Sequence, residues 1–244
     1  MKLNCDLGES FGQYTLGCDE QAMGVIDMAN IACGFHASDP NVMAHTLSLA
    51  KQHNVEIGAH PSYPDRQGFG RRSMQLSTTE LTNLLHYQIA TLEGMAKVQG
   101  LSLSYVKPHG ALYNDMMANS ELLTTIAQAI ASYPCELKLM VLSKIDNSQA
   151  IKIAQKAGIE LLFEVFADRQ YTPDGSLVSR NLAGAVHDET KLLEQVSELK
   201  QFGTITTRDG GKLTLQCDSL CVHGDNPSAV GQIAKIKQII GSNE

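Results

Sequence analysis

Short apolar runs of strand length alternate with longer segments of helical periodicity along the whole 244-residue chain. The expected strands lie at residues 2–6, 28–33, 55–60, 104–107, 137–142, 160–165, 204–207 and 219–223. The expected helices lie at 40–53, 119–132, 146–157, 188–201 and 226–241, with a long one from a capping box at 77–80 to near Gly100. This alternation predicts a parallel sheet with right-handed crossover connections.

Polar residues follow the first four expected strands and the last one, and their positions favour a closed barrel over an open doubly wound sheet. In a barrel the first and last strands are neighbours, whereas in an open sheet they can lie far apart. We therefore expect a TIM-like (β/α) barrel of seven or eight parallel strands, forming one domain over residues 1–244. The sequence Asp209-Gly210-Gly211 predicts a hairpin excursion before the last strand.

Composition excludes several classes of protein. The net charge of −7 without a basic block argues against a nucleic acid as the main partner. No stretch approaches the roughly 18 consecutive apolar residues of a membrane span. The first residues lack an apolar signal region, so we expect a cytoplasmic protein. The six cysteines form no CxxC pair, and we expect buried thiols rather than disulfides.

Three pairs of polar residues, each spaced two apart, follow apolar runs. They are Asn4 and Asp6, Lys107 and His109, and His223 and Asp225. Residues two apart in an extended chain point the same way, so each pair directs two side chains to one face. Because the carboxyl ends of barrel strands form one mouth, this pattern predicts the active site of an enzyme.

The candidate catalytic residues are Asp6, His36, His60, Lys107, His109 and His223. Asp6 is expected to act as the base, and His109 or His223 as the acid. His36 and His60 follow the second and third strands and would bind substrate or orient water. An Asp6–His36–His60 metal site is the alternative, although no HExxH motif supports it.

A lysine that ends an apolar strand is costly to bury unless it meets an anion or a carboxylate, so Lys107 is expected to bind an anion. Two arginines close the glycine-rich loop at 67–73, where they can clamp an anion or simply lie on the surface. Asp168 and Arg169 follow another strand and can pair with each other. The candidate substrate-binding residues are Asn4, Glu9, Arg71, Arg72, Tyr113, Asp168, Arg169 and Asp225.

Seven segments of the chain together resemble one known family. They are LNCDLGESFG, ANIACGFHASDP, IGAHPSYPDR, GFGRR, YVKPHGALYN, EVFADRQY and CVHGDNP. In this order, and from residue 1 essentially to the end of the chain, they resemble the LamB/YcsF family. One departure is visible, because Ser38 stands where the family typically has the second glycine of GFHAGDP.

The resemblance implies a barrel related to the glycoside hydrolase and deacetylase barrels. It also implies the A subunit of an ATP-dependent 5-oxoprolinase, an enzyme that converts 5-oxoproline, ATP and water to glutamate, ADP and phosphate with two partner subunits. No P-loop occurs in this chain, so ATP can bind an unrecognised site here or a partner. We hypothesise that this chain hydrolyses an activated intermediate made elsewhere.

Four points stay open at the level of sequence. A divalent metal and a homo-oligomer are both compatible with the pattern of residues. A metal-dependent amidohydrolase or deacetylase that acts without ATP is one alternative function. A non-catalytic subunit that binds a small carboxylate is the other.

Overall fold

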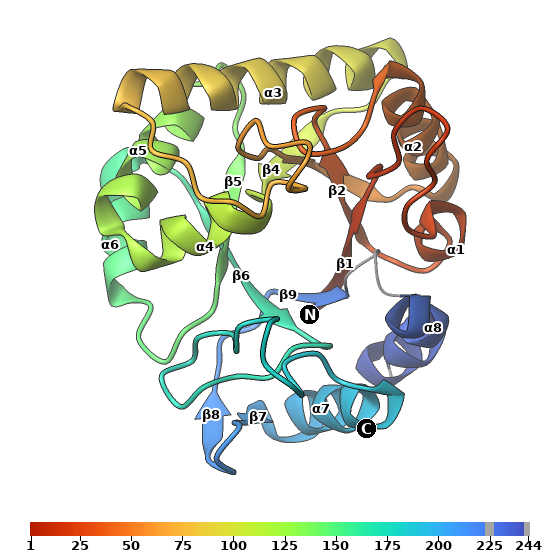
Figure 1. Ribbon diagram of the computed structural model, residues 1–244, viewed down its shortest axis with the longest axis vertical. Helices are drawn as coiled ribbons and strands as arrows, with labels where there is room; N and C mark the ends of the chain where they lie inside the picture. Colours follow the sequence, from red (N-terminus) through yellow and green to blue (C-terminus); the bar gives the residue numbers. More distant parts are fainter. Residues whose placement is uncertain (223–226, 242–244) are drawn as a thin grey trace.

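The computed structural model describes residues 1–222 and 227–241. Seven parallel strands form a closed barrel in the order β1-β2-β3-β4-β5-β6-β9, and β9 pairs with β1 to close it (Figure 1). Their bounds are β1 (Lys2–Leu7), β2 (Met28–Ala32), β3 (Glu56–His60), β4 (Leu103–Val106), β5 (Lys138–Leu142), β6 (Leu161–Phe166) and β9 (Ser219–Val222). The predicted closed barrel is confirmed, with the first and last strands as neighbours.

Helices surround the barrel (Figure 1). They are α1 (Asp19–Met23), α2 (Pro40–His53), α3 (Thr78–Val98), α4 (Gly110–Ala118), α5 (Ser120–Ala131), α6 (Ser148–Ala157), α7 (Glu189–Phe202) and α8 (Pro227–Gly241). The short helices α1 and α4 were not expected from the sequence. Among the described residues, no helix is long and apolar enough to cross a membrane. The one-domain organisation over residues 1–244 stays a prediction.

Local capping determines where the two helices that follow β2 and β3 begin. The Asp39 carboxylate accepts hydrogen bonds from the backbone N–H groups of Asn41 and Val42, which start α2. Ser77 and Glu80 form a reciprocal capping box at the start of α3. Both starts agree with the sequence prediction, because capping depends on residues two or three apart.

The expected strand at 204–207 does not join the barrel. Its residues form β7 (Thr204–Thr206), which pairs antiparallel with β8 (Lys212–Thr214) in a separate two-stranded sheet. The turn between them has Gly210 at φ +86°, and the N–H of Thr207 donates to the Gly211 carbonyl. The predicted hairpin turn folds the strand back on its neighbour, so the barrel has seven strands.

The two faces of β1 point into different environments. Leu3, Cys5 and Leu7 belong to the large apolar core, whereas Asn4 and Asp6 alternate with them and are buried in a polar network. Burying a leucine contributes about 1.5–3 kcal/mol. Met28, Tyr105 and Met140 form a separate small apolar cluster. The period of two therefore directs the polar side chains of β1 away from the apolar core.

Candidate active site

Side chains from strands β1 and β3 and from the loops after β1, β2 and β4 meet at the carboxyl-terminal mouth of the barrel. Asp6 lies on β1 and His60 ends β3, while Lys107 and His109 follow β4. Glu9 and His36 lie on the loops after β1 and β2. All six are buried, with exposures between 1% and 7%.

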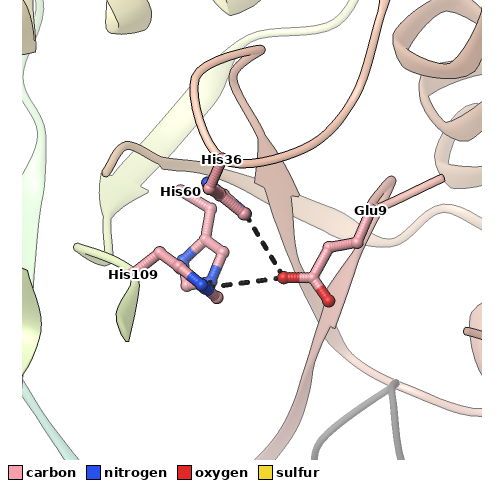
Figure 2. A group of neighbouring side chains, drawn as sticks. All are labelled: Glu9, His36, His60 and His109. Atoms are coloured by element: carbon pink, nitrogen blue, oxygen red, sulfur yellow. Dashed lines mark hydrogen bonds and ion pairs between the residues drawn. The ribbon is translucent and has the colours of Figure 1, made fainter. Parts of the chain in front are cut away.

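Four of these residues form a compact cluster, which we call the histidine centre: Glu9, His36, His60 and His109 (Figure 2). One ligand atom from each lies within 4.8 Å of the others. The Glu9 Oε1 atom is 3.3 Å from His36 Nε2 and 3.5 Å from His109 Nδ1. The rings of His36 and His109 stack, with centroids 3.8 Å apart. Carboxylate and imidazole groups at this spacing can hold a metal ion.

The outer ring nitrogens of two of these histidines face backbone carbonyls. His60 Nδ1 is 2.7 Å from the Lys107 carbonyl oxygen, and His109 Nε2 is 2.9 Å from that of Phe69. A carbonyl can only accept, so both outer nitrogens carry the proton. The inner nitrogens, His60 Nε2 and His109 Nδ1, then direct lone pairs at each other across 2.9 Å.

His36 follows the same pattern through a hydroxyl group. Its Nδ1 atom is 2.9 Å from Ser62 Oγ, and Ser62 Oγ itself donates to the Tyr63 carbonyl. Ser62 therefore accepts from His36 and leaves His36 Nε2 unprotonated beside Glu9. Three imidazole lone pairs and one carboxylate converge without a proton among them, and this donor set fits a bound cation.

Burial also keeps two of these rings neutral. It lowers the pKa of His36 well below its ordinary value, and the nearby His109 and His60 rings lower it further. The pKa of His109 is lowered in the same way, first by burial and then by His60. Neutral imidazole is the form that binds metal ions.

Two glycines allow this close packing of the loops. Gly70 has φ +65°, and a Cβ atom there would lie 2.8 Å from the His109 ring. Gly110 has φ +57°, and a Cβ atom there would lie 2.6 Å from the Gly70 carbonyl oxygen. That carbonyl accepts a hydrogen bond from the N–H of Ala111 at the start of α4. The glycines of the GFGRR and KPHGA segments thus hold the two loops together.

A second cluster, which we call the lysine clamp, lies beside the histidine centre. The Lys107 ammonium is 2.8 Å from Asp6 Oδ1 and 2.7 Å from Glu164 Oε1 on β6. It also lies 3.2 Å from Cys221 Sγ and 3.4 Å from Asn4 Oδ1. Burial alone would lower the pKa of Lys107, but Asp6, Cys221 and Glu164 raise it well above its usual value. Lys107 is therefore a buried cation whose charge is balanced by the carboxylates of Asp6 and Glu164.

Asp6 links the two clusters. Its Oδ1 atom accepts from Lys107 and, at 2.7 Å, from the Asn30 amide on β2, while its Oδ2 atom is 3.5 Å from His60 Nε2. The alternative metal site expected from the sequence was Asp6, His36 and His60. Among the described residues, the group of possible ligands contains both histidines with Glu9 and His109 and leaves Asp6 out. The reason is that Lys107 and Asn30 draw the Asp6 carboxylate toward the barrel interior.

Sequence reasoning missed two members of this network. Glu164 is fully buried, and its Oε2 atom accepts from the Tyr113 hydroxyl at 2.9 Å. Asn30 accepts from the Tyr105 hydroxyl and donates to Asn4 and Asp6. A charged residue inside the apolar run LLFEVF was the available signal for Glu164, since a buried carboxylate needs a partner.

The two arginines of the glycine-rich loop have different surroundings. Arg72 pairs with Asp65, with Nε 2.9 Å from Oδ1. The side-chain hydrogen bond from Arg72 lowers the pKa of Asp65 to about 2. Arg71 instead lines the cavity described below. Arg72 therefore stabilises its own loop, and Arg71 is the arginine that faces the site.

The loop after β6 holds a buried arginine next to the buried Asp168. Arg169 donates through Nη2 to the Val178 carbonyl and through Nε to the Ala185 carbonyl. Burial lowers the pKa of Arg169 to about 10, helped by repulsion from Arg180 and opposed by Asp168. Asp168 is buried beside it but does not line the cavity. The predicted residues His223 and Asp225 lie outside the described residues.

A cavity of about 600 Å³ opens over the two clusters. Asp6, His60, Lys107 and His109 lie in its wall, together with Tyr113. Its volume is that of a small-molecule site. Ser38, the departure from the family pattern, is a buried residue of the loop after β2 and has φ +75°, a backbone conformation that favours glycine.

A parallel barrel with buried ionisable clusters under a cavity at the carboxyl ends of its strands defines a (β/α)-barrel enzyme. The model of the LamB/YcsF family matches residues 1–244, and the chain belongs to this family.

Two curated relatives and one solved structure are similar over nearly their whole lengths. A 5-oxoprolinase A subunit of Pseudomonas putida, numbered 2, is 51% identical over 99% of this chain and 94% of its own length. The 5-oxoprolinase A subunit of Vibrio cholerae is 49% identical over 97% and 96%. The crystal structure of a lactam utilization protein from Thermus thermophilus has a TM-score of 0.90 and 35% identity, over 99% and 97%.

Proposed function

We propose that this chain is the A subunit of an ATP-dependent 5-oxoprolinase and opens the ring of 5-oxo-L-proline by hydrolysis to give L-glutamate. The observation that carries the proposal is the histidine centre next to a cavity lined by its His60 and His109 and by Asp6, in a chain about half identical to proteins named as 5-oxoprolinase A subunits. A five-membered lactam is a resonance-stabilised amide. Its hydrolysis needs an activated water, a base and an acid for the departing nitrogen.

Asp6 is the base in this proposal. Its carboxylate lies in the cavity wall between the histidine centre and Lys107. The ammonium of Lys107 favours the ionised form of Asp6, which is the form that accepts a proton from water. Lys107 then acts on Asp6 rather than on the substrate, because it already contacts Asp6 and Glu164. His223 stays a predicted acid for the ring nitrogen.

The histidine centre fits a divalent cation such as zinc, held by Glu9 and the inner nitrogens of His36, His60 and His109. Such a cation would supply a water of lowered pKa next to the substrate carbonyl. The protein's own contribution is orientation, since the outer hydrogen bonds from His60 to Lys107 O and from His109 to Phe69 O hold the rings in place.

Binding of the substrate carboxylate is assigned to Arg71 and Arg169, which line the same cavity as Asp6. Both are guanidinium groups, which bind carboxylates through paired hydrogen bonds. Tyr113 lies in the wall with its hydroxyl directed to Glu164, and it contributes shape rather than charge.

ATP use is assigned to the complex rather than to this chain alone. The relatives are named as one lettered subunit of an enzyme, which implies further subunits, and this sequence has no P-loop. We propose two partner subunits, a cytoplasmic location, and activation of the lactam on a partner before hydrolysis here.

One alternative function is favoured by a specific observation. Three histidines and a glutamate also suit a metal-dependent amidohydrolase that needs no ATP. A binding subunit without chemistry is a further alternative.

The deciding experiment measures glutamate formed from 5-oxoproline by the chain alone and with its partner subunits, each with and without ATP. The proposal expects glutamate only with partners and ATP. Asp6→Asn and His60→Ala in the complex should each lower turnover by about 10²-fold or more. Asp188→Asn is the matched control, because Asp188 caps α7 and asparagine caps equally well.

Each alternative has its own result. Lactam hydrolysis by the isolated, metal-loaded chain without ATP would establish the amidohydrolase. Unchanged turnover at saturating substrate in both site variants would establish a binding subunit.

A further inference from the structure

The charge of the cavity is opposite to that of the protein. The chain as a whole carries −7. Five cationic side chains line the cavity, and among the described residues Asp6 is the only carboxylate in its lining. The cations are Arg71, Lys107, Lys144, Arg169 and Arg180. A cavity with this imbalance selects anions.

Two carboxylates already compensate one of these cations. The ammonium of Lys107 contacts Asp6 and Glu164 within 3 Å. The other four come from three loops after β3, β5 and β6. Burial lowers the pKa of Arg169, repulsion from Arg180 and Arg71 lowers it further, and Asp168 and Tyr171 oppose this shift. Like charges therefore face one cavity from separate loops.

Arg169 is fixed in position. It is 7% exposed, and two backbone carbonyls hold its Nε and Nη2 atoms. These bonds occupy two of the five guanidinium N–H donors. Lys144 is held similarly, since its ammonium donates to the Met117 carbonyl at 2.8 Å. Cations held by the backbone are already oriented for a ligand.

One carboxylate, as in 5-oxoproline, brings a single negative charge to this wall. A phosphoryl group brings about two more, with three acceptor oxygens. We propose that Lys144 and Arg180 form a phosphoryl-binding subsite beside the place assigned to the substrate carboxylate, with Arg169 lying between the two and shared by both groups. This inference rests on the proposed function, because that function identifies the lactam as the molecule that would carry the phosphoryl group.

The uncharged residues of the cavity lining suit a small ring that carries a phosphoryl group. Leu142, Phe166 and Leu177 lie in the cavity lining and present apolar surface to a small ring. Ser179 and Asn181 lie next to Arg180 in the lining and supply neutral hydrogen-bond donors. The subsite would hold the phosphoryl group of a phosphorylated lactam, or that of a nucleotide, since both share this chemistry.

The test uses calorimetric titration of the full-length isolated chain with inorganic phosphate. Phosphate should bind with a dissociation constant on the order of 1 mM at low ionic strength and more weakly in salt. Arg180→Gln and Lys144→Gln should each weaken it about tenfold. Arg208→Gln and Lys152→Gln are matched controls, because both residues are exposed outside the cavity lining.

Two further titrations distinguish the sources of the phosphoryl group. If 5-oxoproline and phosphate bind together, the subsite serves a phosphorylated lactam. If ATP binds more tightly than phosphate and loses affinity in the same variants, the subsite serves a nucleotide. Arg180→Gln in the complex should also raise KM for the coupled reaction more than it lowers kcat.

Equal phosphate affinity in wild type, Arg180→Gln and Lys144→Gln would overturn the subsite. The subsite would also be overturned if the Arg208→Gln control lost as much phosphate affinity as the Arg180→Gln and Lys144→Gln variants. Thermal unfolding of each variant checks its fold. Arg180 is exposed, so Arg180→Gln is expected to leave the fold intact. Failure of the proposed function is separate, because the complex would then form no glutamate although phosphate still bound this chain.

Discussion

The contacts of the lysine clamp predict both the sign and the size of the stability change when Lys107 is replaced. Lys107→Met replaces the buried ammonium by an apolar side chain of similar length and leaves Asp6 and Glu164 without their shared cation. Removing one partner of a buried ion pair costs about 3–5 kcal/mol. Lys107 contacts two carboxylates, so we expect a loss of about 5 kcal/mol. For a chain of this length, that lowers the melting temperature by about 10–20 °C.

A second substitution separates charge from packing. In the wild-type background, Glu164→Gln removes one ion contact and leaves Lys107 paired with Asp6, so it should destabilise by about 1–3 kcal/mol. In the Lys107→Met background, the same change lowers the buried charge from two carboxylates to one, so it should stabilise. The effect of Glu164→Gln is therefore expected to reverse its sign.

The assay is urea unfolding from pH 5 to pH 9. The pKa of Lys107 is raised in the folded state, so its contribution is complete below the unfolded value of about 10.5 and is lost only above it. In Lys107→Met the two buried carboxylates gain raised pKa values, and stability falls as pH rises above about 4. The difference between wild type and variant should therefore widen from pH 5 to pH 8. Melting within about 2 °C of wild type, or equal effects of Glu164→Gln in both backgrounds, would refute the reasoning.

Three further predictions concern the loops around the site. The pKa values of His36 and His109 are lowered by burial, so metal-free protein should lose stability as pH falls below about 6.5, with a shallower slope in a His36→Gln/His109→Gln double variant. Ser38 has φ +75°, so Ser38→Val should cost about 2 kcal/mol in urea unfolding while Ser38→Gly changes it by less than about 1 kcal/mol. Because Arg72 is paired with Asp65 and Arg71 lines the cavity, Arg72→Gln should keep KM for 5-oxoproline within about twofold, and Arg71→Gln should raise it about tenfold in the coupled assay.

Much of the barrel could be predicted because its determinants are local. The alternation of Leu3, Cys5 and Leu7 with Asn4 and Asp6 separates the apolar core from the polar network on β1. Caps at Asp39 and Ser77 set the starts of α2 and α3 through hydrogen bonds between residues two or three apart. The order of strands and helices then predicts the parallel sheet.

Local sequence patterns gave a wrong prediction where a barrel strand and a hairpin strand have similar propensity. Residues 204–207 have the composition of a barrel strand, but β7 pairs with β8 across the Gly210 turn. Whether a strand joins the barrel depends on whether a neighbouring barrel strand is free to pair with it. Here β6 pairs with β9, a strand far along the chain, and this leaves no place for β7.

Sequence by itself determined which residues end the strands and therefore which side chains can reach the mouth of the barrel, because a period of two and local capping are properties of neighbouring residues. Tertiary structure alone decided their grouping. Glu9, rather than Asp6, joins the histidines, and Glu164 reaches Lys107. A buried charge takes whichever opposite charge the folded chain brings within about 4 Å, and residues on different strands and loops become neighbours only through the fold.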